Sequence, residues 1–459
     1  MQEIKPQKNI FSLVVLTMLF FMWGFMTVLN DILIPYMKGV FQLNHTQAMM
    51  IQLSFFGAYF IGSVIYFFIS SSIGDPINKI GYKNGIIGGL LLSSIGTFLF
   101  YPAAEFQSYI FFLLALFIVG LGFTLLQIAA NPYVAIIGDP DTASSRLNLS
   151  QGFNSLGTTI GPLIGGYLIF TYFVDPKISG PTAVKIPYLI FCGIFILLAM
   201  IIKLIHLPEF SNQEHLEKGF GAFKFRQLSL GMIAIFMYVG GEVSIGSMMI
   251  SFLSLKEIAG LTKDAAAKYV AFYWGGLMIG RFIGAISLSK IRTNIKIMLI
   301  LTIPITAFLI IWNQMGINVA SIYSIFLIIN TLAFFIGRFI PNRTLYIFVI
   351  FAILLLLVSL MTTGTIAMWC IIGIGLFNSI MWSNIFTLSI DGLGKYTSQG
   401  SSLLVMAILG GAVLPVIQGA IADAAGVHFS FVLPIISYLY IAFYGINGYK
   451  KRHIRESQI

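Results

Sequence analysis

Two acidic residues lie inside long apolar stretches of this chain, where an ionised side chain is costly. Asp31 comes near the end of the apolar run that starts at Phe11, and Glu242 lies near the midpoint of the run 229–254. An ionised carboxylate at the centre of a bilayer costs roughly 2.5–3.5 kcal/mol even on the most lenient insertion scale. Acidic side chains in such positions typically face a hydrated cavity, where they bind a cation, a proton or a polar substrate.

Amide, hydroxyl and aromatic side chains also lie within several of the long apolar runs. They are spaced so that, in a helix, they form a polar stripe along one face. Gln127 and Asn131, for example, are four residues apart and share one helix face. Amides and carboxylates bind hydroxyl groups, and an aromatic ring can stack on the C–H face of a sugar, so these stripes indicate a site for a neutral sugar. The residues that we expect at this site are Trp23, Thr27, Asn30, Gln127, Asn131, Gln151, Asn154, Tyr238, Glu242, Asn378 and Trp382.

Each of these side chains also has a purely structural interpretation. An amide in a membrane helix can simply bond one helix to another, at about 0.6 kcal/mol per bond. Asp31 could pair with a helix end near the membrane surface. Arg281 follows Gly280 near the cytoplasmic end of its run. We therefore expect Arg281 to act as a conformational clamp, away from the substrate, and a neutral substrate to fit better than an anion.

The composition identifies the class of protein that must position these residues. The 459 residues are 58% hydrophobic and 9% charged, with a mean hydropathy of +0.94, whereas soluble domains carry about 25% charged residues. The chain is therefore expected to be an all-α polytopic membrane protein. It contains no HExxH pair, nucleophile elbow or phosphate-binding loop, so we do not expect an enzyme.

Apolar runs of about 20 residues can span a bilayer as a helix, and the chain contains fourteen of them. Most of the 26 Lys and Arg residues fall in alternate loops, which predicts that both termini are cytoplasmic. The expected spans are 11–36, 47–73, 84–102, 108–137, 145–172, 186–205, 229–254, 268–289, 294–312, 317–337, 344–362, 365–390, 398–421 and 428–447.

The two halves of the chain resemble each other, as in duplicated transporter folds. Residues 55–63 align with 273–281, and 120–136 align with 373–389. The second match is the fourth span of the first half but the sixth of the second half, so the second half contains an extra helix pair. The expected domains are a six-helix bundle (1–206), a cytoplasmic loop (207–228) and a second bundle (229–459) with the extra pair within 294–362.

Several motifs are similar to those of the fucose–galactose–glucose:proton symporters of the major facilitator superfamily, and the resemblance covers nearly the whole chain apart from the extra helix pair. They are "LLQIAANPYVAIIG" (125–138), "SSRLNLSQGFNSLGTTIGPLIGG" (144–166), "GGEVSIGS" (240–247), "GRFIGA" (280–285) and the loop "GDPINKIGYK" (74–83). The resemblance implies two pseudo-symmetric six-helix bundles, one central site, and cation-coupled uptake of a hexose by alternating access. It also implies gating roles for Lys79 and Arg281, although Asn78 stands where an Asp is usual.

The coupling ion follows from the same resemblance. Asp31 matches the first-helix aspartate of fucose permeases, whereas Gln127 falls where those proteins carry a titratable glutamate. An amide cannot titrate, so we favour Na⁺ over H⁺, with Asp31, Asn30, Gln127 and Asn131 as the cation-coupling group and Asp31 as the Na⁺ ligand. The expected substrate is glucose or galactose. An L-fucose:H⁺ symporter and a drug or cation exporter remain the alternatives.

The remaining expectations concern the setting of the protein. We expect a monomer in the bacterial inner membrane that needs no cofactor beyond a bound Na⁺ and has no nucleic-acid partner, because the basic balance of the chain is explained by its loops.

Overall fold

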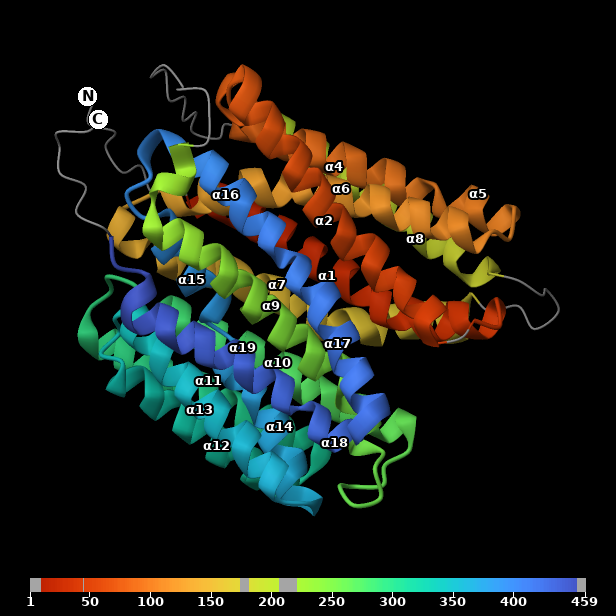
Figure 1. The fold of residues 1–459 in the computed structure, drawn as a ribbon, viewed down its shortest axis with the longest axis vertical. Coiled ribbons are helices and arrows are strands. Elements are labelled where there is room, and N and C mark those ends of the chain that lie inside the picture. Colours follow the sequence, from red (N-terminus) through yellow and green to blue (C-terminus); the bar gives the residue numbers. More distant parts are fainter. Residues whose placement is uncertain (1–9, 44, 174–180, 206–220, 452–459) are drawn as a thin grey trace. The chain divides into compact units, whose positions relative to one another are not determined.

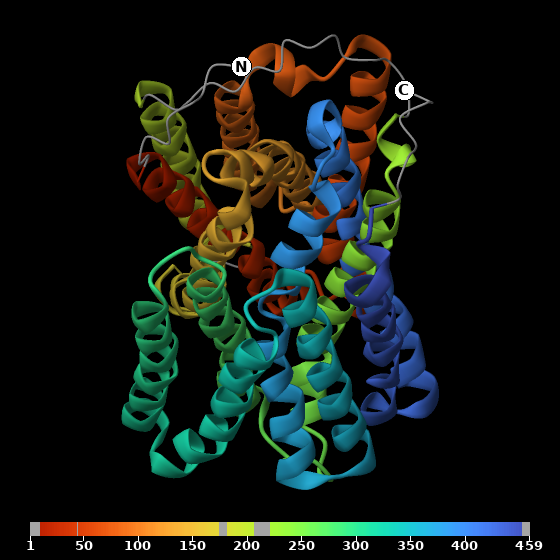
Figure 2. The ribbon, with the colours of Figure 1, turned by 90° about the vertical axis from the view of Figure 1, so that its left-hand side faces the viewer.

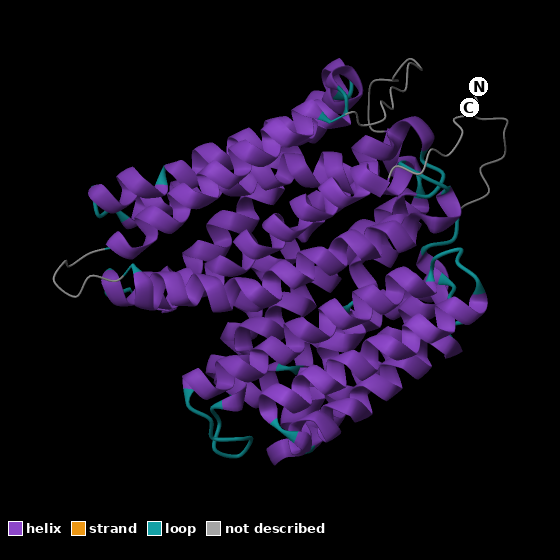
Figure 3. Ribbon diagram, turned by 180° about the vertical axis from the view of Figure 1, so that it is seen from behind, coloured by secondary structure: helices purple, strands orange, loops and turns teal. Residues whose placement is uncertain are grey.

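The computed structural model describes residues 10–43, 45–173, 181–205 and 221–451. In these residues every regular element is a helix, as Figure 3 shows. Each of the fourteen predicted spans coincides with one helix or with a run of two or three consecutive helical segments, so the prediction of an all-α polytopic chain is confirmed.

Thirteen helices in the described residues are long and apolar enough to cross a membrane. One predicted span, 145–172, has no counterpart among these thirteen helices. It corresponds to helix α7 (Ala143–Tyr167). This helix carries the polar stripe that includes Gln151 and Asn154. A helix with so many amides is suited to the interior of a bundle, where its polar side chains avoid lipid.

The first compact unit is formed by residues 1–139, 153–219 and 395–412. In Figure 1, α4, α6 and α8 of this unit run side by side. Close packing between α4 and α6 depends on glycine, because a Cβ at Gly89 would lie 2.8 Å from the carbonyl oxygen of Gly122. The helices of the unit, besides most of α7, are α1 (Ile10–Val40), α2 (His45–Ile73), α3 (Pro76–Ile80), α4 (Tyr82–Phe98), α5 (Phe100–Glu105), α6 (Tyr109–Ile136), α8 (Lys185–Leu204) and α16 (Thr397–Met406).

The second compact unit is formed by residues 140–152, 220–394 and 413–459. Its helices α10 and α14 meet at Gly375, where a Cβ would lie 2.1 Å from the carbonyl oxygen of Tyr273. The helices of the unit are α9 (Arg226–Leu253), α10 (Lys263–Ser287), α11 (Thr293–Met315), α12 (Ile317–Ile336), α13 (Pro341–Met361), α14 (Gly364–Asn378), α15 (Met381–Ile390), most of α17 (Gly410–Ala425), α18 (Val427–Ser430) and α19 (Val432–Phe443).

The same packing pattern occurs in both units. In the first, α4 packs against α6 and α8, and α2 packs against α6; in the second, α13 packs against α14 and α19, and α10 packs against α14. Helices α11 and α12 have no counterpart in this pattern. They form an antiparallel hairpin (Figure 2) that turns at Gly316, where φ is +84°. The extra pair expected within 294–362 is therefore α11 and α12.

The compact units do not follow the chain strictly in order. Residues 140–152, which include the start of α7, group with the second unit, and residues 395–412, which include α16, group with the first. Once α11 and α12 are set aside, α7 and α16 begin the fifth span of their respective halves. The predicted bundle boundaries at 206 and 229 separate the two halves of the internal repeat in the sequence, and they stay a prediction.

Candidate functional site

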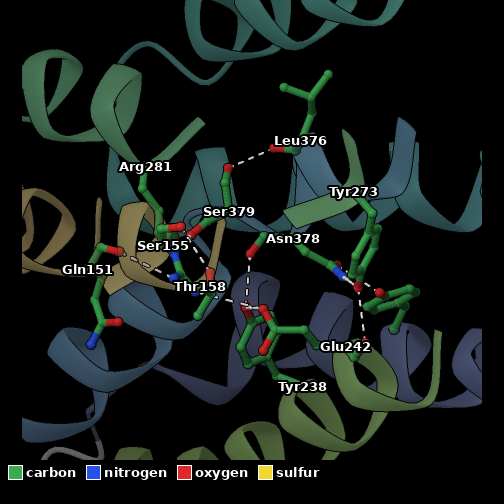
Figure 4. Close-up of polar contacts among 11 residues, drawn as sticks. Gln151, Ser155, Thr158, Tyr238, Glu242, Tyr273, Arg281, Leu376, Asn378 and Ser379 are labelled. Carbon is green, nitrogen blue, oxygen red and sulfur yellow. Dashed lines mark hydrogen bonds and ion pairs between the residues drawn. The ribbon is translucent and has the colours of Figure 1, made fainter. Parts of the chain in front are cut away.

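A buried ion pair lies at the centre of the polar cluster in the second unit (Figure 4). Glu242 of α9 and Arg281 of α10 approach to 3.7 Å between Oε1 and Nη2, and their side chains are 12% and 7% exposed. The hydroxyl of Tyr238, one turn before Glu242, donates to Glu242 Oε1 at 2.5 Å. The carboxylate is thus held by a neutral donor on its own helix and by a cation on the next.

The helix that faces this pair is interrupted. Helix α14 ends at Asn378 and α15 begins at Met381, and this break leaves carbonyl groups without the usual partners in their own helix. Ser379 O accepts a hydrogen bond from Arg281 Nε at 2.9 Å, and Asn378 O lies 3.1 Å from the Tyr238 hydroxyl. Arg281 of α10 therefore supplies a donor to one of these carbonyl groups, and the Tyr238 hydroxyl of α9 lies beside the other while its single proton goes to Glu242. Helices α9 and α10 also carry the ion pair.

Asn378 connects the break to two further tyrosines. Its Nδ2 donates to the Tyr273 hydroxyl at 2.8 Å, and its Oδ1 accepts from the Tyr438 hydroxyl at 2.7 Å. The Tyr273 hydroxyl in turn donates to the backbone carbonyl of Glu242 at 3.0 Å. Because Asn378 and the two tyrosines are buried, these bonds fix the orientation of all three side chains.

Arg281 lies closer to Glu242 than its place in the sequence suggested. We expected it near the cytoplasmic end of its run, and it lies within 4 Å of Glu242; its role as a clamp stays a prediction. Position along a span predicts depth only roughly, because helices tilt and an Arg side chain extends over several ångströms. Arg281 Nη1 also donates to the carbonyl of Gln151 at 3.3 Å, which brings the start of α7 to the same cluster.

Sequence reasoning missed Tyr273, Ser379 and Tyr438 as members of the cluster. Tyr273 was used only to align the two halves of the chain. Neither Ser379 nor Tyr438 has a sequence signal that distinguishes it from the many other Ser and Tyr residues in the spans, because each becomes significant only where the helices meet.

The first unit holds a polar group of a different kind. Asn30 of α1 and Gln127 and Asn131 of α6 are each at most 2% exposed. Among the described residues no partner is found for Asn30 Nδ2, Gln127 Oε1 or either polar atom of the Asn131 side chain. Buried polar atoms in native proteins almost always have a hydrogen-bond partner, so these amides are suited to a bound polar ligand or water.

Aromatic side chains accompany these amides. The indole Nε1 of Trp23 donates to the hydroxyl of Tyr59 on α2 at 3.1 Å, and the same hydroxyl interacts with Thr27 and Gln127. Thr27 also donates to the backbone of Trp23 at 2.9 Å. Trp23, Thr27 and Gln127 are therefore brought together around one tyrosine.

Other predicted site residues make contacts of a structural kind. Asn154 Nδ2 donates to the carbonyl of Phe20 on α1 at 3.1 Å. The ring of Trp382 stacks on Phe386 with centroids 5.0 Å apart. Lys79 Nζ donates to the carbonyl of Ile73, at the end of α2. The Asn154 contact joins two helices, the Lys79 contact caps a helix, and the Trp382 contact lies within α15. The substrate-binding or gating roles of these residues stay predictions.

The predicted cation site is only partly described. Asp31 lies in α1, but its side chain lies outside the described part of the structure. Among the described residues no group of three or more His, Cys, Asp or Glu side chains could hold a metal ion. Amide oxygens such as those of Gln127 and Asn131 are also acceptable ligands for a hard cation, so the predicted Na⁺ role of this group remains a prediction.

Comparison with known proteins places the chain in a family. The Major Facilitator Superfamily matches residues 14–330. The chain is 46% identical over 453 residues to a protein of Brucella abortus named glucose/galactose transporter, covering 98% of this chain and 97% of the relative. It is 36% identical over 464 residues to a putative glucose/galactose transporter of Helicobacter pylori, covering 98% and 99%.

A solved structure agrees with this relationship. The crystal structure of a major facilitator superfamily transporter, FucP, in the outward conformation superposes with a TM-score of 0.75 at 29% identity, covering 96% of this chain and 99% of that chain. This chain thus belongs to the major facilitator superfamily, a family of multi-pass membrane transporters and not of enzymes.

Proposed function

We propose that this protein is a secondary active transporter that takes up a neutral hexose, glucose or galactose, together with a cation by alternating access. Relatives that match it over nearly its whole length are named glucose/galactose transporters. The observation that supports a sugar substrate most directly is the set of buried amide atoms without a partner on Asn30, Gln127 and Asn131. Sugar hydroxyls both donate and accept, so they can satisfy amide nitrogens and oxygens alike.

The two units contribute differently to binding in this proposal. In the first, the amides bind hydroxyl groups, and Trp23 offers an aromatic face to the ring of the sugar. In the second, Glu242 accepts hydrogen bonds from sugar hydroxyls, in a position fixed by Tyr238 and Arg281. Glu242→Ala is then expected to weaken hexose affinity. Unchanged affinity in this variant would remove Glu242 from the substrate site.

Coupling is assigned to the group Asp31, Asn30, Gln127 and Asn131, with Na⁺ favoured over H⁺. Gln127 cannot titrate, which weakens the case for a proton, whereas Na⁺ needs several oxygen ligands of the type that this group contains. We place the transporter in the bacterial inner membrane as a monomer, with both termini cytoplasmic, as the loop charges predict.

Gating is assigned to Lys79 and Arg281. Arg281 supports this role by its bonds to Ser379 O and Gln151 O, because a side chain that joins the start of α7 to the interrupted helix must rearrange if either one moves. For Lys79 the assignment rests on the resemblance of the loop 74–83, and its contact with the end of α2 is a helix cap.

The decisive experiment is uptake of labelled hexose into proteoliposomes with a sodium gradient and a proton gradient imposed separately. The proposal predicts concentrative uptake of glucose or galactose that collapses when the sodium gradient is removed. Uptake driven by the proton gradient alone would transfer the coupling to H⁺. Accumulation of L-fucose but not of glucose or galactose would favour a fucose symporter, and competition by lipophilic cations but not by hexoses would favour an exporter.

A further inference from the structure

The hairpin of α11 and α12 has two helices with very different surroundings. In α11 only Ile300 and Ala307 are buried, so the helix presents nearly all of its apolar surface outward, as a lipid-facing helix does. Helix α12 exposes one apolar face, which includes Ile325 and Leu332, but its opposite face is buried. The buried face carries side chains that hydrogen-bond to neighbouring helices.

Asn330 of α12 contacts the interrupted helix just before its break. Its Nδ2 donates to the carbonyl of Leu376 in α14 at 2.9 Å. The same carbonyl accepts a hydrogen bond from Ser379 Oγ at 2.6 Å, and Ser379 O accepts from Arg281 Nε (Figure 4). Three consecutive contacts therefore connect Asn330 to the arginine of the ion pair.

Tyr323 contacts the helix that carries Arg281. Its hydroxyl donates to the carbonyl of Phe272 in α10 at 3.0 Å, next to Tyr273, which bonds to Glu242 and Asn378. A Cβ at Gly276 would lie 2.8 Å from the Tyr323 hydroxyl and 2.9 Å from Leu376 N. Helices α10, α12 and α14 thus meet without space for another side chain, so a shift of α12 must be transmitted to the other two.

A hairpin that only faced lipid would not need these side chains. A buried amide in a membrane helix is costly unless it is bonded, and α11 shows that an apolar sequence is sufficient for a lipid-facing helix. Asn330 is fully buried, and its Oδ1 has no partner among the described residues. Its donor bond to Leu376 O is thus the one interaction described for this side chain that offsets its burial.

We propose that the hairpin of α11 and α12 is a positioning element for the substrate site, in which Asn330 and Tyr323 hold α14 and α10 so that Arg281 and Glu242 keep their spacing. Neither residue touches substrate; both act through the backbone of helices that carry the pair. This inference rests on the proposed function, because Glu242 must contribute to hexose binding for its placement to matter.

The test compares Asn330→Leu with Asn318→Leu in full-length protein reconstituted into proteoliposomes. Both variants make the same change in α12, but Asn318 is exposed. Counterflow of D-glucose and of D-galactose is measured, with rates normalised to folded transporter. Loss of one interhelical hydrogen bond is expected to raise the KM of Asn330→Leu about threefold to tenfold, with the maximal rate little changed. Asn318→Leu should behave as the unaltered protein.

Tyr323→Phe provides a second variant that removes only a hydroxyl and should fold readily. It is expected to raise KM in the same direction as Asn330→Leu. A purely structural hairpin would instead lower the amount of folded protein or the maximal rate and leave KM unchanged in both variants, which would overturn the inference. Failure of the unaltered protein to transport either hexose would overturn the proposed function, and the inference with it.

Discussion

Two polar groups of the molecule, one in each unit, differ in how completely their side chains are paired. In the second unit, Glu242, Arg281 and Asn378 are each held by protein groups on at least two sides. In the first unit, Gln127 and Asn131 are as deeply buried but keep polar atoms without a partner among the described residues. The difference indicates that the group around Glu242 is held by the protein itself, whereas Gln127 and Asn131 keep polar atoms available to a ligand or water.

The physical reason lies in what these two groups contain, because the group around Glu242 is charged and Gln127 and Asn131 are neutral amides. A charge in a membrane helix must be paired to be tolerated, so Glu242 and Arg281 require a complete set of neighbours. A neutral amide costs less when a bond is missing, so an amide group can remain open for a substrate. Burial therefore has a different consequence in the two groups, and substitutions can separate them.

The largest expected effect is on stability, from breaking the ion pair. Arg281→Met leaves the Glu242 carboxylate buried without its cation and is expected to destabilise the protein by about 3–5 kcal/mol. The double variant Glu242→Gln/Arg281→Met should recover much of this loss, because no uncompensated charge remains. Thermal melting of the purified transporter measures both effects.

The matched control for this prediction is the exposed ion pair Lys451–Asp391, with 55% and 62% exposed side chains. Lys451→Met should change the melting temperature little, because exposed pairs contribute about 0–1 kcal/mol. If Arg281→Met lowered the melting temperature no more than Lys451→Met, the ion pair between Arg281 and Glu242 would not contribute to the stability of the protein.

The next effect is on coupling in the first unit. Asp31→Asn should abolish uphill accumulation of hexose in proteoliposomes while sugar exchange down its gradient continues, because an amide of similar size can bind hydroxyls but carries no charge for a cation. Accumulation against a gradient and counterflow are measured on the same preparation. Unchanged accumulation in Asp31→Asn would remove this residue from the mechanism.

A smaller effect distinguishes amides without a described protein partner from amides whose nitrogen and oxygen are both hydrogen-bonded. Asn131→Leu removes an amide for which no protein partner is described, so hexose KM should rise about tenfold while the melting temperature is unchanged or higher. Asn378→Leu removes bonds to Tyr273 and Tyr438, so both affinity and melting temperature should fall. Equal loss of stability in the two variants would contradict the comparison between the units.

The smallest effect is expected from Tyr238→Phe. This change removes the hydroxyl donor to Glu242 but keeps the ring, at a cost of about 1 kcal/mol or somewhat more for a bond to a charged group. Hexose KM in counterflow should rise a few-fold. A change as large as that of Glu242→Ala would mean that Tyr238 itself contacts the sugar.

Much of the architecture follows from the sequence because the cost of burying charge and backbone in a membrane acts locally. Runs of apolar residues must be helices, so the fourteen spans could be read along the chain, and Asp31 and Glu242 stood out because a carboxylate in such a run is expensive. The internal repeat even predicted an extra helix pair, although its limits could be set only from the packing.

Only the tertiary structure could decide which residues meet. Arg281 joins Glu242 because α9, α10 and the interruption between α14 and α15 converge, and no spacing within one helix encodes that meeting. In the same way, Asn330 is an ordinary amide in sequence and becomes a support for the site only because its helix packs against α14. Sequence by itself determined which side chains need partners, since that requirement follows from the solvent. The fold decided which partners they find, because contacts between distant segments depend on how whole helices pack.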